Sequence, residues 1–151
     1  MSAAVLSPDE VLERLPQREP FRFVDRIVEI DEEHVVAEYE WRRDADFYRG
    51  HFPGRPITPG VLLIEAMAQA GVVALGIYLL AREGGDASGA LTVFSEANVE
   101  FNGLVEPGSR VRIEGRKVFF RRRKLRAEVE MRLADGTLVC SGTLAGVGVE
   151  R

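Results

Sequence analysis

The chain has 151 residues and a formal net charge of −4, with 46% hydrophobic and 29% charged residues. This length and balance predict one folded domain over residues 1–151 and exclude a disordered chain. The acidic balance disfavours a nucleic-acid partner, and two histidines with one cysteine are too few for an ordinary zinc site. Because the single Cys140 excludes an internal disulfide and the N-terminus carries no export signal, we expect a cytoplasmic protein.

The first part of the chain predicts a short helix followed by two strands. Ser7-Pro8-Asp9-Glu10 has the pattern of a capping box, and the helix that it starts ends before Pro16. Residues 21–30 and 34–41 are typical of strands, and the acidic residues 31–33 form the turn between them.

A long apolar helix is predicted from Thr58-Pro59 to a stop at residues 82–85. Its residues 61–81 are long enough to span a bilayer. However, Glu65 would be costly in lipid, and the flanks carry neither an aromatic belt nor a basic asymmetry. We therefore expect no membrane span and predict that this helix is the buried centre of a soluble domain.

After a loop at 84–89, the rest of the chain predicts four antiparallel strands. Alternating apolar residues mark them at 91–101, 110–114, 125–133 and 137–149. The result is an α+β fold, in which an antiparallel sheet of about six strands wraps around the long central helix. One sheet can hardly cover a helix that is apolar all round, so we expect a second copy of the chain to cover the rest in a homodimer.

Two side chains in and after the proline-rich segment 50–60 suggest a proton-transfer site. His51 lies on a loop that three prolines hold in one shape, which suits a general base, although a structural histidine is the more common case. Glu65 has apolar neighbours, and burial would favour its protonated form as a proton donor. The alternative is a carboxylate that Gln69, one helical turn later, satisfies by hydrogen bonding.

Two further features each have a functional and a structural interpretation. Gly60 lies in the first turn of the helix, where free N–H groups could form an oxyanion hole, or the glycine could relieve crowding at the junction. The basic run Arg121, Arg122, Arg123 and Lys124 could dock an acidic partner or a phosphate, or be a solvated strand end.

Residues 47–69, FYRGHFPGRPITPGVLLIEAMAQ, resemble the 3-hydroxyacyl-[acyl-carrier-protein] dehydratases of the FabA/FabZ type. The motifs around Leu15-Pro16 and Val24-Asp25-Arg26 resemble the family's N-terminal signature, and the similarity covers nearly the whole chain. The chain departs from the family at Pro16-Gln17-Arg18, where Pro-His-Arg is usual, and at Asn102-Gly103, where basic residues often occur. The resemblance implies the hotdog fold.

The resemblance also implies a reaction, the dehydration of a (3R)-3-hydroxyacyl thioester to the trans-2-enoyl thioester. His51 matches the family's catalytic histidine, and Glu65 matches its catalytic carboxylate, which the other subunit of the dimer supplies. A glutamate at this position resembles the FabZ branch, which dehydrates without isomerising the double bond. Met67, Phe94 and Phe101 are candidates for lining a tunnel for the acyl chain, with core packing as the alternative.

The partner implied by this resemblance is an acyl carrier protein that holds its acyl group on phosphopantetheine, with the basic run 121–124 as a candidate docking surface. No metal or cofactor is implied, and the assembly is a homodimer, with a trimer of dimers left open. Two other functions stay open. A hotdog thioesterase would use Glu65 to activate water, and a non-catalytic subunit would only bind acyl groups.

Overall fold

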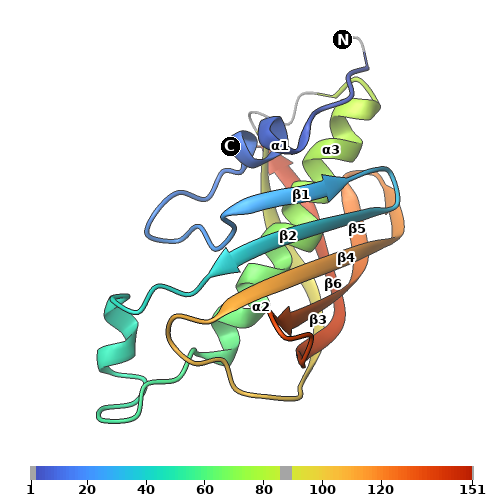
Figure 1. Ribbon diagram of the computed structural model, residues 1–151. Coiled ribbons are helices and arrows are strands. Elements are labelled where there is room, and N and C mark those ends of the chain that lie inside the picture. Colours follow the sequence, from blue (N-terminus) through green and yellow to red (C-terminus); the bar gives the residue numbers. More distant parts are fainter. Residues whose placement is uncertain (1–2, 86–89, 151) are drawn as a thin grey trace.

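A six-stranded antiparallel sheet curves around one long helix in the computed structural model, which describes residues 3–85 and 90–150 (Figure 1). The strands are β1 (Arg26–Ile30), β2 (His34–Glu40), β3 (Ala90–Phe101), β4 (Arg110–Arg121), β5 (Lys124–Leu133) and β6 (Leu138–Glu150). They lie in the order β1-β2-β4-β5-β6-β3. The predicted α+β class, with a sheet of six strands and a long central helix, is confirmed.

The central helix runs through three helical segments, α2 (Gly60–Ala68), the π-helical η2 (Gln69–Ala74) and α3 (Leu75–Arg82). It is long and apolar enough to cross a membrane, but 67% of its most apolar window is buried inside the structure. This burial is what a core helix shows. The shorter α1 (Pro8–Arg14) begins at the predicted capping box, in which Ser7 and Glu10 each accept a hydrogen bond from the other's N–H.

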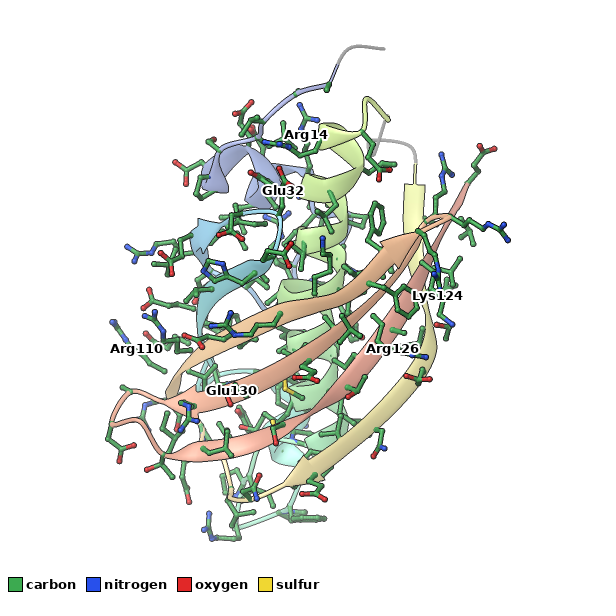
Figure 2. All side chains as sticks on the ribbon, turned by 90° about the vertical axis from the view of Figure 1, so that its right-hand side faces the viewer. Arg14, Glu32, Arg110, Lys124, Arg126 and Glu130 are labelled. Carbon is green, nitrogen blue, oxygen red and sulfur yellow. The ribbon has the colours of Figure 1, made fainter. Side chains whose placement is uncertain are left out.

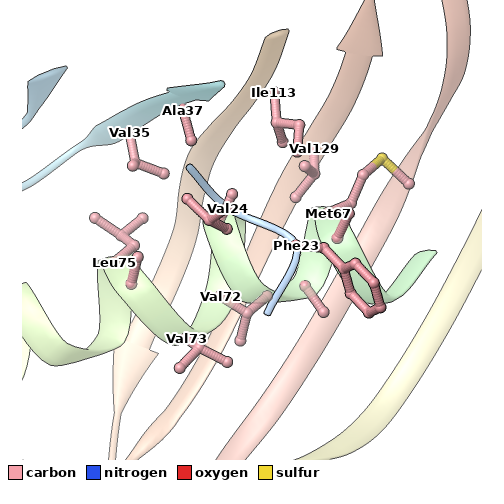
Figure 3. Close-up of a cluster of buried hydrophobic side chains, with 14 of the residues drawn as sticks. Phe23, Val24, Val35, Ala37, Met67, Val72, Val73, Leu75, Ile113 and Val129 are labelled. Carbon is pink, nitrogen blue, oxygen red and sulfur yellow. The ribbon is translucent and has the colours of Figure 1, made fainter. Parts of the chain in front are cut away.

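The helix approaches the sheet most closely where Gly71 faces Gly115 of β4. A Cβ added to Gly115 would lie 2.8 Å from the Cα of Gly71, and one added to Gly71 would lie 2.6 Å from a methyl carbon of Val129. Neither position has room for a methyl group. Around this contact, Met67, Val72 and Leu75 of the helix pack against Val35, Ala37, Ile113 and Val129 of the sheet (Figure 3).

The other face of the sheet is polar, as alternation in β5 predicts. Leu125, Ala127 and Val129 are buried against the helix. Figure 2 shows Arg126 and Glu130 of the same strand among the charged side chains on the outer face. One core therefore lies between the helix and a single face of the sheet.

The N-terminal segment covers a side of the helix that the sequence analysis assigned to a second copy. The first strand begins at Arg26, later than the predicted residue 21, because the N–H of Phe23 donates to Oε1 of the buried Gln69, at 2.8 Å, in place of a neighbouring strand. Phe23 and Val24 thus lie over the helix (Figure 3). Because the chain's own N-terminal segment covers this side of the helix, the apolar surface of the helix is no argument for a dimer.

β3, at the edge of the sheet, carries a group of exposed apolar residues, namely Leu91, Val93, Phe94 and Phe101. The register shifts between Phe94 and Glu96, so that Ser95 is an extra residue in the ladder. Because this bulge reverses the alternation, Phe94 and Phe101 lie on the same face of the strand although they are seven residues apart. Both side chains are 50% exposed. A long edge strand with exposed apolar residues is a template for pairing with another chain.

The contact between Gly71 and Gly115 predicts that Gly71→Ala destabilises the protein. Overpacking of this kind costs about 1–3 kcal/mol. Chemical denaturation of the variant should show this loss in the free energy of unfolding.

Gly76→Ala in the same helix is the matched control, because its added Cβ would lie 3.9 Å from the nearest atom, in Leu125. It should leave the free energy of unfolding equal or raise it by up to about 1 kcal/mol. Equal stabilities for the two variants would contradict the close contact.

Candidate active site

His51 lies on a loop that backbone hydrogen bonds and an ion pair hold closed. Its N–H donates to the carbonyl of Phe47 at 3.1 Å, and its own carbonyl accepts from the N–H of Ile57 at 2.9 Å. Arg55 pairs with Glu106 at 3.0 Å across the base of the loop. The ring of His51 is partly buried and stacks on Phe52, with 4.2 Å between centroids. Hydrogen bonds, in addition to the three prolines, thus hold His51 in place.

The loop also fixes which nitrogen of His51 can take a proton. Nδ1 lies 2.9 Å from the carbonyl oxygen of Ile57. A carbonyl oxygen only accepts hydrogen bonds, so Nδ1 carries the hydrogen and Nε2 of the neutral ring keeps a free lone pair. This is the tautomer that a general base needs.

Glu65 is partly buried in α2 and accepts a hydrogen bond from Nε2 of Gln69 at 3.0 Å. The orientation of the Gln69 amide is set independently, since its Oε1 accepts from Phe23 and its Nε2 also donates to the carbonyl of Phe21 at 2.9 Å. The satisfied carboxyl that the sequence analysis kept as an alternative is therefore present. It does not exclude a proton-transfer role, because Gln69 occupies Oε1 and leaves Oε2 as the oxygen that can hold a transferable proton.

Glu65 opens into a small cavity of about 40 Å³, which we call the Glu65 pocket. Its other walls include Gln17, Ala68, Phe94 and Ala145. A second cavity of about 40 Å³, which we call the distal pocket, lies next to it along the helix. The two cavities share four lining residues, Val72, Val73, Thr92 and Gly146. The walls of the two cavities are mostly apolar and extend from Glu65 to Leu80 and Phe120. Helical spacing from Glu65 could have identified Ala68 and Val72, whereas the only sequence signal at Gln17 is its departure from the Pro-His-Arg that is usual in the family.

Gly60 is the first residue of α2, and Phe101 closes over it. The N–H groups of Leu62 and Leu63 both bond to the carbonyl of Pro59, so those of Gly60 and Val61 come before the first helical acceptor. A Cβ on Gly60 would lie 3.1 Å from the ring of Phe101. Both predicted interpretations of Gly60 thus have a physical basis, since the position is crowded and also presents free N–H groups.

The other candidate residues are dispersed. Phe94 lines the Glu65 pocket, whereas Met67 has no exposed surface and lies 3.7 Å, sulfur to sulfur, from Cys140. Burial raises the pKa of Cys140 to about 12, which makes it a poor nucleophile.

The basic run 121–124 forms the β4–β5 hairpin, at the opposite end of the sheet from the His51 loop (Figure 1). Arg123 of this hairpin lines the distal pocket.

Similar proteins agree on a family and on a fold. The solved structures include the dehydratase heterocomplex ApeI:P from Xenorhabdus doucetiae, with a TM-score of 0.78 and 19% identity, covering 98% of this chain and 94% of that one. They also include a thioesterase from Haemophilus influenzae, with a TM-score of 0.68 and 13% identity, covering 97% and 93%. At these identities the likeness shows the fold alone, and the predicted hotdog fold is confirmed.

The sequence relatives are more specific. The chain is 34% identical to the 3-hydroxyacyl-[acyl-carrier-protein] dehydratase FabZ of Lactococcus lactis subsp. cremoris (strain MG1363), covering 95% of this chain and 96% of the relative. It is 37% identical to the FabZ dehydratase of Clostridium perfringens (strain SM101), covering 93% and 96%. The model of the FabA-like domain matches residues 15–145. This chain is therefore a member of the FabA-like domain family.

Proposed function

We propose that this protein dehydrates (3R)-3-hydroxyacyl thioesters carried on an acyl carrier protein to trans-2-enoyl thioesters, in the biosynthesis of fatty acids or related lipids. The observation that carries the proposal is the fixed tautomer of His51, which leaves Nε2 free to accept a proton. The FabZ relatives, at 34–37% identity over most of the chain, support the same reaction. We also propose a cytoplasmic location and a requirement for neither metal nor cofactor.

The proposed reaction assigns one proton transfer to each group. Nε2 of His51 takes the proton on C2, and the electrons of that C–H bond form the C2–C3 double bond. The C3–O bond breaks, and the leaving hydroxyl receives a proton from Oε2 of Glu65 and departs as water. The N–H of Gly60 stabilises the negative charge that develops on the thioester oxygen. The product is the enoyl thioester, and His51 returns its proton to Glu65 before the next turnover.

We propose that His51 and Glu65 of different subunits form each site. His51 is not among the residues that line the Glu65 pocket, although Phe94 of β3 is. The edge of β3 is open to a second chain, and Leu91, Val93 and Phe94 are at least 36% exposed along it. A homodimer built on this edge would cover these side chains and bring a second His51 loop to the pocket.

The acyl group and its carrier have candidate sites on the same chain. The Glu65 and distal pockets are the proposed path of the acyl chain, and Phe94 and Phe101 lie on the face of β3 that borders it. A lining role for Met67 would need a shift of the core, because its side chain is fully buried here. Docking of the acidic carrier at the 121–124 hairpin remains a proposal based on charge.

The central test is turnover by single-site variants with a 3-hydroxyacyl carrier thioester. The wild type should produce enoyl absorbance without free thiol. His51→Ala and Glu65→Ala should each lower kcat by about a hundredfold or more, the usual contribution of acid–base groups. Release of free thiol would indicate the alternative thioesterase, and acyl binding without turnover would indicate the non-catalytic subunit.

His34→Ala is the matched control, since His34 pairs with Asp31 and Glu29 at the β1–β2 turn and lines neither pocket. It should retain the wild-type rate. A near wild-type rate for His51→Ala would contradict the site assignment.

Gln69→Met tests whether the amide positions Glu65. The variant removes the donor to Glu65 and leaves the N–H of Phe23 unpaired, so the free energy of unfolding should fall by about 1–3 kcal/mol. We expect kcat to fall by about tenfold with little change in KM, because the carboxyl is no longer oriented. Gly71→Ala controls for lost stability. If both variants, fully folded, had the same kcat, Gln69 would have only a structural role.

A further inference from the structure

Gln17 carries a buried hydrogen-bond acceptor without a partner. Among the residues that the structure describes, three buried side-chain polar atoms lack a partner: Oε1 of Gln17, Nε1 of Trp41 and Nε of Arg126. Of these residues, Gln17 lines the Glu65 pocket, and the other two line neither this pocket nor the distal one. An unpaired buried amide oxygen is costly, so folded proteins rarely keep one without a use.

The backbone around Gln17 holds this side chain in place. The carbonyl of Gln17 accepts from Nε of Arg22 at 3.0 Å. Two arginines, Arg18 and Arg22, donate to the carbonyl of Leu15 at 3.0 and 3.1 Å. Leu15 itself is fully buried in the core. The segment that carries Gln17 is thus held by hydrogen bonds on both sides, beside the pocket that this residue lines.

The chemistry of the pocket indicates what the acceptor can bind. The remaining walls are apolar apart from Glu65 and Thr92, and neither of these donates to Oε1 of Gln17. A ligand that reaches Oε1 can therefore supply the hydrogen that it lacks. On the proposed function, the group of the substrate that lies next to Glu65 is the 3-hydroxyl, which has one hydrogen to donate.

We propose that Gln17 is a positioning residue that accepts a hydrogen bond from the substrate's 3-hydroxyl. The hydroxyl then has its single hydrogen directed at Gln17 and a lone pair directed at Oε2 of Glu65. This is the orientation in which Glu65 can protonate the leaving oxygen. Without the acceptor, the hydroxyl can donate its hydrogen to Glu65 and lie in an unproductive orientation. The inference rests on the proposed dehydration.

Gln17→Met tests the proposal, because methionine has a similar length and lacks the acceptor. Loss of one neutral hydrogen bond should lower kcat/KM for a 3-hydroxyacyl thioester by about tenfold. The inhibition constant of the saturated acyl thioester, which lacks the 3-hydroxyl, should stay within about twofold, and the melting temperature should not fall. Thr143→Val is the control, since it also removes a side-chain hydroxyl but lies on β6 outside both pockets, and its kcat/KM should stay within about twofold.

Two results would overturn the role of Gln17. One is an unchanged kcat/KM in Gln17→Met. The other is an equal loss in kcat/KM and in affinity for the saturated ligand, which is the mark of a merely structural role.

If the wild-type protein showed no turnover, the proposed dehydration would be rejected, and the role of Gln17 would be tested by binding alone. The affinities of the 3-hydroxyacyl and saturated ligands would then be compared in the His51→Ala background, with and without Gln17→Met. A tenfold loss confined to the 3-hydroxy ligand would support the role of Gln17, and equal affinities would reject it.

Discussion

The close contact of the central helix with the sheet at Gly71 and Gly115 is the constraint on which the rest of the structure depends. No side chain fits between the two backbones, so the helix can lie at one depth and in one rotation. That rotation directs Met67, Val72 and Leu75 toward the core and places Glu65 on the side of the two pockets. The π-helical turn η2 includes Gly71 and begins at Gln69. π-turns of this kind recur near functional sites.

The buried Gln69 links the position of the central helix to the position of the Glu65 carboxyl. Its amide joins the N-terminal segment, through Phe21 and Phe23, to the carboxyl of Glu65. The same hydrogen bonds explain why Phe23 and Val24 lie over the helix and not in the sheet. The segment that precedes Phe21 adds Gln17 to the pocket that Glu65 lines. One folding contact thus places the proposed acid, while its proposed positioning residue comes from the segment beside it.

Much of the fold could be predicted from the sequence, because the spacing of apolar residues and the residues that form turns are local signals. The capping box at Ser7, the long apolar helix and the alternation in β5 all have the predicted form. The family resemblance of residues 47–69 is likewise confirmed. What could not be predicted depends on contacts between distant segments. The hydrogen bond from Phe23 to Gln69 spans 46 residues, and the bulge at Ser95 follows from pairing with β6. The open acceptor of Gln17 is visible only when the pocket is assembled.

The central claim is that two chains share each site, and mixing two inactive variants tests it most directly. His51→Ala and Glu65→Ala homodimers are mixed in equal amounts, partly unfolded and refolded so that subunits exchange. If sites are shared, half of the dimers become mixed, and each mixed dimer has one intact site of two. Activity should then return to about a quarter of the wild-type rate. If activity stays at the level of the separate variants although mixed dimers have formed, His51 and Glu65 do not form a site across two chains.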